Sequence, residues 1–302
     1  MKMKKFILLL LVSLFAAAVL VGCAGDNTED AGNDSPAEEE VESNDDAGED
    51  DSAEEASATL EGTITMAGST SVQPLSEELA AVFMDEHPGV RLEVSGGGSG
   101  AGVVAAQENT ADFGAASREI KDDETGIKTY TIAIDGIAVI VHLDNGVEDL
   151  ALEDIQKIFS GEITNWSEVG GADENIVVVS REEGSGTRGA FDDIVLGDAV
   201  LVDTALIQNS TGAVAEAVST EVNAIGYVST GSLEDDVKPL LVDGVEPTSE
   251  EIVAGNYPVA RPFNYVSNED EALSELAQAF LDFVLSEEGQ QVVEDKGFVK
   301  VN

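Results

Sequence analysis

The segment from Arg181 to Thr187, with the sequence Arg-Glu-Glu-Gly-Ser-Gly-Thr, carries the strongest chemical signal in the chain. It follows an apolar run at residues 176–179 and precedes a stretch, 188–196, that has the pattern of a helix. A strand, a glycine-broken loop and a helix start aim backbone N–H groups, hydroxyls and a guanidinium at one point. Such donors fit an oxyanion. The alternative is a surface turn in which Ser185 caps the helix.

Two earlier segments have the same character. The first is Gly-Ser-Thr-Ser at residues 68–71, in which Ser69 is the first hydroxyl. The second is Ser-Gly-Gly-Gly-Ser-Gly-Ala-Gly at residues 95–102, which contains Ser99. Taken alone, the first segment can also be a simple helix cap formed by Thr70 or Ser71. The second lacks the Gly-Lys-Ser/Thr ending of a nucleotide-binding loop, which argues against nucleotide hydrolysis. Three such loops predict a buried anion that is held without a metal ion.

Ser117 and Arg118 end a predicted strand and could add a hydroxyl and a cation to the anion site, or simply be a solvated strand end.

Catalysis is not expected, because the residues that it needs are missing from these loops. The only histidines, His87 and His142, lie outside the donor loops, so no serine has an obvious general base. We find no cluster of metal ligands for a phosphatase. The sequence therefore predicts a binding protein, with neither a cofactor nor a metal.

The elements that must position these loops alternate between strands and helices. Strands are expected at 63–66, 91–94, 111–115, 131–143, 176–179, 224–228, 240–242 and 257–266. Helices are expected at 72–87, 102–108, 152–159, 188–196, 214–219, 271–285 and 288–294. This order predicts an α/β fold with mostly parallel sheets flanked by helices. Ligands of such sheets bind at the carboxyl ends of strands, where all three donor loops fall.

The chain is expected to form two α/β lobes, because it is long for one core and has no linker after residue 61. Two extended segments, 131–143 and 257–266, are long enough to cross between lobes. We assign residues 61–133 and 258–302 to lobe I and residues 134–257 to lobe II. The two crossing segments would then be hinge strands.

The first residues have the pattern of a processing signal. A basic start and an apolar run at 7–21 lead to Leu-Val-Gly-Cys, which matches a bacterial lipobox ending at Cys23. We expect residues 1–22 to be a lipoprotein signal peptide and Cys23 to carry lipid after cleavage. The alternative is an uncleaved anchor with a chance cysteine. Because the chain has no second cysteine, it can form no internal disulfide.

Acidic residues dominate the rest of the chain. Residues 24–60 contain 15 acidic residues and no lysine or arginine, so we expect residues 23–60 to be a disordered tether; an acidic tail that binds ligands is the alternative. Residues 61–302 hold the other 46 acidic residues and 11 basic ones, a net charge of −35. Such a surface suits high salt or high pH outside the cell. It excludes nucleic acid as a partner, because phosphate backbones require a basic face.

Residues 60–302 resemble the substrate-binding lipoproteins of bacterial ABC phosphate importers. The segments that carry the resemblance are Ala67-Gly-Ser-Thr-Ser-Val-Gln-Pro-Leu75, Gly96-Gly-Gly-Ser-Gly-Ala-Gly102, Asp112-Phe-Gly-Ala-Ala-Ser-Arg118, Ala133-Ile-Asp-Gly-Ile-Ala-Val139, Ile158-Phe-Ser-Gly-Glu-Ile-Thr-Asn-Trp166, Arg181-Glu-Glu-Gly-Ser-Gly-Thr187, Ala224-Ile-Gly-Tyr-Val228 and Phe280-Leu-Asp-Phe-Val-Leu-Ser-Glu-Glu-Gly289.

The resemblance implies a two-lobed, hinge-closing fold of the periplasmic-binding-protein type (type II). It implies a dehydrated phosphate held wholly by hydrogen bonds. The alternative is a binding protein for another oxyanion, sulfate or molybdate. The ligating residues that it implies are Thr70, Ser71, Ser99, Arg181, Ser185, Gly186 and Thr187. It further implies a monomer, lipid-anchored on the extracytoplasmic face of a Gram-positive cell, that delivers phosphate to the permease subunits of an ABC importer.

One departure from the family concerns selectivity. In part of this family an aspartate follows the third strand and accepts the proton of bound phosphate, whereas Ser117 and then Arg118 stand here. A carboxylate rejects sulfate, which has no proton to offer, but a hydroxyl can donate as readily as accept. Asp135, in the first crossing strand, could be the replacement acceptor. The alternative is that Asp135 is a hydrogen-bonded hinge residue.

Overall fold

The computed structural model describes residues 60–301; the predicted signal peptide, Cys23 and the tether lie outside the described residues. Its strands are β1 (Glu61–Gly68), β2 (Gly89–Ser95), β3 (Phe113–Ala116), β4 (Ile127–His142), β5 (Asp149–Leu150), β6 (Val177–Arg181), β7 (Leu206–Gln208), β8 (Ala224–Ser229), β9 (Val237–Pro239), β10 (Leu241–Val242) and β11 (Ala260–Asn268). Its α-helices are α1 (Gln73–Glu86), α2 (Ser99–Gln107), α3 (Leu152–Ser160), α4 (Gly186–Phe191), α5 (Thr211–Thr220), α6 (Ser249–Val253), α7 (Glu275–Leu285) and α8 (Glu287–Asp295). Three short turns complete the list: 3-10 helices at Trp166–Val169 and Thr230–Ser232, and a π-helix at Asp192–Leu196.

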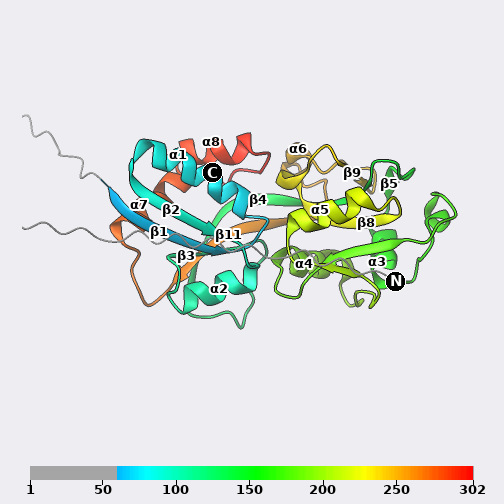
Figure 1. Cartoon of the computed structure of the whole chain (residues 1–302), viewed down its shortest axis with the longest axis horizontal. Helices are drawn as coiled ribbons and strands as arrows, with labels where there is room; N and C mark the ends of the chain where they lie inside the picture. Colours follow the sequence, from blue (N-terminus) through cyan, green and yellow to red (C-terminus); the bar gives the residue numbers. More distant parts are fainter. Residues whose placement is uncertain (1–59, 302) are drawn as a thin grey trace, which may run out of the picture. The chain divides into compact units, whose positions relative to one another are not determined.

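Lobe I is built on β2, β1 and β3, which pair in parallel, with β11 antiparallel to β3. Its core lies between this sheet and the apolar faces of α1, α7 and α8, where Phe83, Phe113 and Phe280 pack together. Helix α2 covers the other face through Val103 and Ala106 (Figure 1). The alternation of strand and helix in the sequence therefore produces a sheet with helices on both faces.

Lobe II repeats this plan with a second core. Strand β6 pairs in parallel with β7 and β8, and β8 and β9 pair antiparallel with the second half of β4. Helices α3 and α4 cover one face, where Phe159, Phe191 and Tyr227 form an aromatic cluster. Helix α5 covers the other face with Val214 and Val218 (Figure 1).

Strand β4 runs from lobe I into lobe II: its first half pairs antiparallel with β11 and its second half with β8 and β9, which joins the two sheets into one path. The register of β4 and β11 places Arg261 of β11 opposite Asp135 of β4. A two-lobed α/β fold with two crossing strands is confirmed. The predicted lobe boundaries stay predictions; the one after residue 133 falls inside β4, and the one after residue 257 falls shortly before β11.

Three predicted helix starts, those of α2, α5 and α7, are wrong by three or four residues; α5 begins at Thr211 and not at 214. Helix α2 begins at Ser99, three residues before the predicted start, because the glycines around it are a packing surface; a Cβ on Gly102 would lie 2.7 Å from Ala115 O. Helix α7 begins at Glu275, four residues after the predicted start, because Ser274 caps it by accepting the N–H of Ala277 at 3.1 Å. Within residues 60–301, no helix is both long and apolar enough to cross a bilayer.

Candidate oxyanion-binding site between the lobes

The turn between β1 and α1 supplies three hydroxyls, and each is held in a different way. Ser69 is buried, and its Oγ accepts the N–H groups of Ser71 and Val72 at 3.2 and 3.3 Å. The Ser69 hydroxyl donates to Ser117 Oγ at 2.8 Å. Ser69 therefore fixes the turn and orients Ser117, while Thr70 and Ser71 face the other lobe.

The start of α2 and the end of β3 form the second part of the site. Ser99 Oγ accepts the N–H of Ser117 at 3.0 Å, and the two hydroxyl oxygens lie 3.4 Å apart. Both side chains are fully buried. Gly98, with φ of +88°, allows the chain to turn into the helix, and a Cβ there would lie 2.8 Å from Gly184 O of lobe II. This glycine therefore lets the two lobes approach.

The loop between β6 and α4 brings the third group of donors. Ser185 caps α4 by accepting the N–H of Arg188 at 3.2 Å, which leaves its own O–H proton for another acceptor. Gly186 and Thr187 follow, both buried. A Cβ on Gly186 would collide with Ser99 Oγ and lie 2.7 Å from Ser117 Oγ. The three donor loops of the sequence analysis thus meet at this point.

Arg181 is almost fully buried at the end of β6, and its guanidinium has two edges with different partners. Its Nε and Nη2 donate to the two carboxylate oxygens of Glu182 at 3.0 and 2.9 Å. Its Nη1 donates to Thr211 Oγ1 at 3.2 Å. The Nε–Nη2 edge, which could bind an oxyanion through two parallel hydrogen bonds, is therefore occupied by Glu182. The Nη1 side remains for an anion.

Tyr227 and Arg188 hold the backbone of Arg181. Tyr227 Oη accepts the Arg181 N–H at 3.4 Å, and Arg188 Nη1 donates to the Arg181 carbonyl at 3.0 Å. Burial raises the pKa of Tyr227 to about 12, so its hydroxyl stays protonated at neutral pH and bonds to Ser180 Oγ at 2.8 Å. The guanidinium of Arg181 is therefore placed by a rigid strand end.

Thr211 belongs to the site but was missed in the sequence analysis. It is the first residue of α5, is 3% exposed, and bonds to Ser71 Oγ at 2.8 Å as well as to Arg181. The signal was present, since Ser210-Thr211-Gly212 repeats the pattern of hydroxyls and glycine before a helix. It was overlooked because the helix was predicted to begin only at residue 214.

The guanidinium of Arg118 is paired with groups outside the donor loops. Its Nη1 and Nη2 donate to the Glu124 carboxylate at 2.7 and 2.6 Å, and Nη1 also donates to the Glu119 carbonyl at 2.9 Å. Burial raises the pKa of the Glu124 carboxyl, but the hydrogen bonds and charge of Arg118, aided by Lys121, outweigh burial and lower it. Arg118 thus anchors the loop after Ser117, and its contact with a ligand stays a prediction.

Asp135 has the contacts of the hinge alternative. Its Oδ2 accepts Nε and Nη2 of Arg261 at 3.1 and 2.9 Å, and its Oδ1 accepts from Ser229 Oγ at 2.9 Å and from Thr230 N and Oγ1 at 3.2 and 3.0 Å. Burial raises the pKa of Asp135 and lowers that of Arg261, and each partner opposes the shift of the other. Arg261 Nη1 also donates to the Ser117 carbonyl at 3.0 Å. The pair therefore ties the donor loop of lobe I to the hinge.

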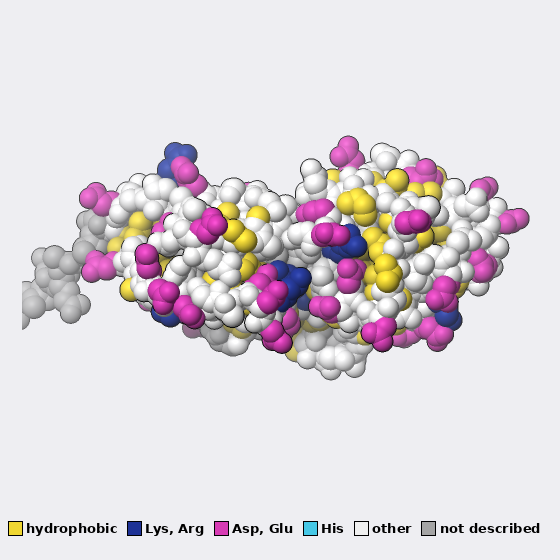
Figure 2. Space-filling model, turned by 90° about the horizontal axis from the view of Figure 1, so that it is seen from below, with side chains coloured by type: hydrophobic (Ala, Val, Ile, Leu, Met, Phe, Trp, Pro, Cys, Tyr) yellow, Lys and Arg dark blue, Asp and Glu magenta, His cyan; other side chains and the backbone are white. Residues whose placement is uncertain are grey.

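The site is positive only locally. Figure 2 shows acidic side chains spread over one face, with few basic ones among them. Between residues 60 and 301, no group of three or more His, Cys, Asp or Glu side chains could hold a metal ion. The arrangement is a buried cluster of hydroxyl and N–H donors with one guanidinium, which suits an oxyanion that sheds its water.

Residues 53–288 match the model of the PBP superfamily domain. The chain belongs to this superfamily. Over its whole length it is 33% identical to the phosphate-binding protein PstS of Bacillus subtilis, 95% of which is covered. This similarity confirms the resemblance to the phosphate-binding proteins of ABC importers.

Two solved structures are similar to the chain over most of its length. A putative phosphate ABC transporter substrate-binding protein from Clostridium perfringens, with bound phosphate, is 43% identical with a TM-score of 0.77; the match covers 80% of this chain and 100% of that one. An ABC-type phosphate transport receptor from Vibrio cholerae is 34% identical with a TM-score of 0.66, covering 78% and 99%. These matches confirm the periplasmic-binding-protein-like fold.

Proposed function

We propose that this protein binds inorganic phosphate between its lobes and delivers it to an ABC importer. The observation that carries the proposal is the convergence of hydroxyls and one buried guanidinium from both lobes. The residues that we assign to direct contact with the ligand are Thr70, Ser99, Ser117, Arg181, Ser185, Gly186 and Thr187, while Ser69 and Ser71 orient Ser117 and Thr187 through their hydroxyls. Their donors match the several lone pairs of a tetrahedral oxyanion without a metal ion. Relatives named for phosphate binding support the same ligand.

Arg118 and Asp135 have a different part in this proposal. Both were candidates for direct contact, but each is held by an ion pair with its own partner, Glu124 and Arg261. We assign them to the framework: Arg118 holds the loop after β3, and Asp135 holds the hinge. Neither side chain then accepts the hydrogen bond of the ligand's P–OH group. A hydroxyl of the site can accept that hydrogen bond, but it can also donate to sulfate.

The proposal includes no chemical step. A hydrolase of phosphate esters needs a nucleophile with a base, or a metal-bound water. The hydroxyls of this site hydrogen-bond to one another or to backbone N–H groups, and the nearby carboxylate of Glu182 is paired with Arg181. The relatives that match are binding proteins as well. We therefore assign the protein a transport role, with a permease as its partner.

The cellular location of the protein is part of the proposal. The lipobox pattern ending at Cys23 supports a lipid anchor on the extracytoplasmic face of the cell membrane, and the acidic residues that follow support a tether. A single lipid-anchored copy, working as a monomer, is enough for delivery to a membrane-embedded permease. Metabolic labelling with a palmitate analogue would test the anchor: the wild type should be labelled and Cys23→Ala should not.

Equilibrium dialysis with labelled phosphate tests the binding itself. Phosphate-free protein should retain one phosphate per chain, and unlabelled phosphate should displace it. Sulfate and molybdate should compete only at much higher concentration. If either anion displaces the label as well as phosphate does, the protein serves a different oxyanion. If no label is retained, the proposed function is wrong.

A further inference from the structure

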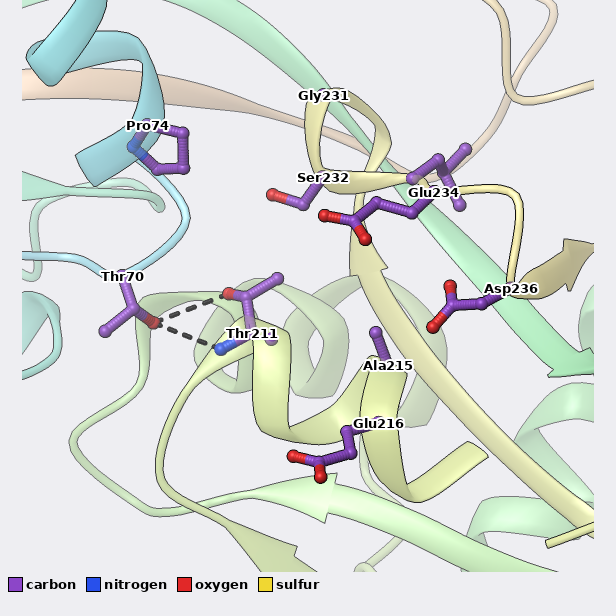
Figure 3. Close-up of a pocket in the computed structure, with 11 residues that line it drawn as sticks. Thr70, Pro74, Thr211, Ala215, Glu216, Gly231, Ser232, Glu234 and Asp236 are labelled. Atoms are coloured by element: carbon purple, nitrogen blue, oxygen red, sulfur yellow. Dashed lines mark hydrogen bonds between the residues drawn. The ribbon is translucent and has the colours of Figure 1, made fainter. Parts of the chain in front are cut away.

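Four hydroxyls form a continuous chain of hydrogen bonds across the junction of the lobes, here called the hydroxyl chain. Thr70 and Ser71 come from lobe I, and Thr187 and Thr211 come from lobe II. Thr211 Oγ1 lies 3.4 Å from Thr70 Oγ1 and 2.8 Å from Ser71 Oγ, and Ser71 Oγ lies 2.7 Å from Thr187 Oγ1. Figure 3 shows the side chains of Thr70 and Thr211 pointing toward one another at the edge of a pocket.

Arg181 sets which hydroxyl donates and which accepts along the hydroxyl chain. A guanidinium can only donate, so its Nη1–H makes Thr211 Oγ1 an acceptor. The proton of Thr211 is then free to donate, and Ser71 Oγ offers the shorter contact, 2.8 Å against 3.4 Å for Thr70. Ser71, having accepted, can then donate its own proton to Thr187 Oγ1, which leaves the proton of Thr187 for the next acceptor. Each hydrogen bond polarises the one after it.

We infer that Thr211 is the positioning residue that makes Thr187 an obligate donor to the bound oxyanion and locks the lobes in the closed state. This inference rests on the proposed function, because it concerns the same phosphate. Thr211 acts through Ser71 and Thr187. The bonds of Thr70 and Ser71 to Thr211 join different lobes and exist only when the lobes are together. Opening the cleft breaks them.

The hydrogen bonds of this hydroxyl chain differ in their exposure to solvent. Thr70 and Thr211 line a pocket of about 520 Å³, where Glu216, Glu234 and Asp236 also lie, so solvent can compete for their contact (Figure 3). Ser71 and Thr187 are almost completely buried. Hydrogen bonds shielded from water are stronger, so the links of Ser71 should decide how long the cleft stays closed. Thr211 is the residue that orients them.

Replacement of Thr211 by valine tests the inference, since valine keeps the shape and removes the hydroxyl. We expect Thr211→Val to bind phosphate ten- to a hundredfold more weakly, a loss of about one charge-assisted hydrogen bond. Most of the loss should appear as faster phosphate release in stopped-flow measurements, with the association rate changed much less. Thr211→Ser, which restores the hydroxyl, should release phosphate within about threefold of the wild-type rate.

Thr220→Val is the matched control, because Thr220 ends the same helix, is exposed and bonds to the carbonyls of Glu216 and Ala217. It should release phosphate at the wild-type rate. Wild-type release by Thr211→Val would overturn the inference while leaving phosphate binding intact. The inference would also be overturned if both Thr211→Ser and Thr211→Val bound phosphate slowly and released it fast. The packing of the Thr211 methyl group, and not its hydroxyl, would then explain the effect. A wild type that binds no phosphate would overturn the proposed function itself.

Discussion

Arg181 and Ser185 were predicted to act together, but their surroundings differ. Removing the Arg181 side chain deletes the only cation seen to contact the donor hydroxyls in residues 60–301, and it leaves the Glu182 carboxylate without its partner beside the anion. We expect Arg181→Ala to weaken phosphate binding by about 3 kcal/mol or more. Ser185→Ala should cost about 1–3 kcal/mol, because one donor is lost.

Equilibrium dialysis of both variants checks this order, with Arg91→Ala as the control. Arg91 is exposed and pairs with the exposed Glu93, so its loss should leave affinity unchanged. An Arg181→Ala variant with wild-type affinity would mean that the anion binds elsewhere.

Asp135 gives a second prediction at this scale. Asp135→Asn leaves the buried guanidinium of Arg261 without its counter-charge, so we expect the free energy of unfolding to fall by about 3 kcal/mol. Because the carboxylate oxygens already accept from Arg261, Ser229 and Thr230, the ratio of phosphate to sulfate affinity should stay within about threefold of the wild type.

Denaturant unfolding and competition binding measure the two effects, and Asp144→Asn, an exposed aspartate in the turn after β4, is the control. A collapse of the phosphate-to-sulfate ratio in Asp135→Asn would instead support Asp135 as the acceptor of the ligand proton.

At the scale of elements, the glycines in the loops set how closely the lobes approach. Gly186 of lobe II packs on Ser99 and Ser117 of lobe I, with no room for a Cβ. We expect Gly186→Ala to hold the lobes apart. Solution scattering of phosphate-free wild type should show a smaller radius of gyration after phosphate is added, as β4 and β11 flex. Gly186→Ala should keep the larger radius.

Gly146→Ala is the control for scattering, because nothing lies within 4 Å of a Cβ at that position. It should close as the wild type does. If the wild type has the same radius with and without phosphate, the lobes do not move and this account of the hinge is wrong.

The same scale shows what the sequence could predict. Hydrophobic periodicity located α1, α3 and α8 to within two residues, because each helix buries one face and exposes the other. It could not locate the first turn of α2 or α5, whose residues are small or hydroxylated and bury backbone rather than apolar side chains. Those first turns hold Ser99 and Thr211. Nor could it show that Glu182 and Arg261 would take the charges of Arg181 and Asp135, since such pairing depends on the tertiary structure.

At the scale of the whole molecule, charge acts against the ligand. The net charge of −35 on residues 61–302 repels an incoming anion, so added salt should speed phosphate association by screening that field. The site's own contacts are short and buried, so affinity should change little. Titrations from low to molar sodium chloride would check this, and a steep loss of affinity would mean that the site is open to solvent.

Calorimetric titration of phosphate-free protein, with and without a metal chelator, tests the central claim most directly. The account predicts one phosphate per chain and the same affinity in both conditions, because hydroxyls, backbone N–H groups and Arg181 supply all the donors. Sulfate and molybdate should give little heat at the same concentrations. Phosphate binding that vanishes with the chelator and returns with a divalent cation would contradict it.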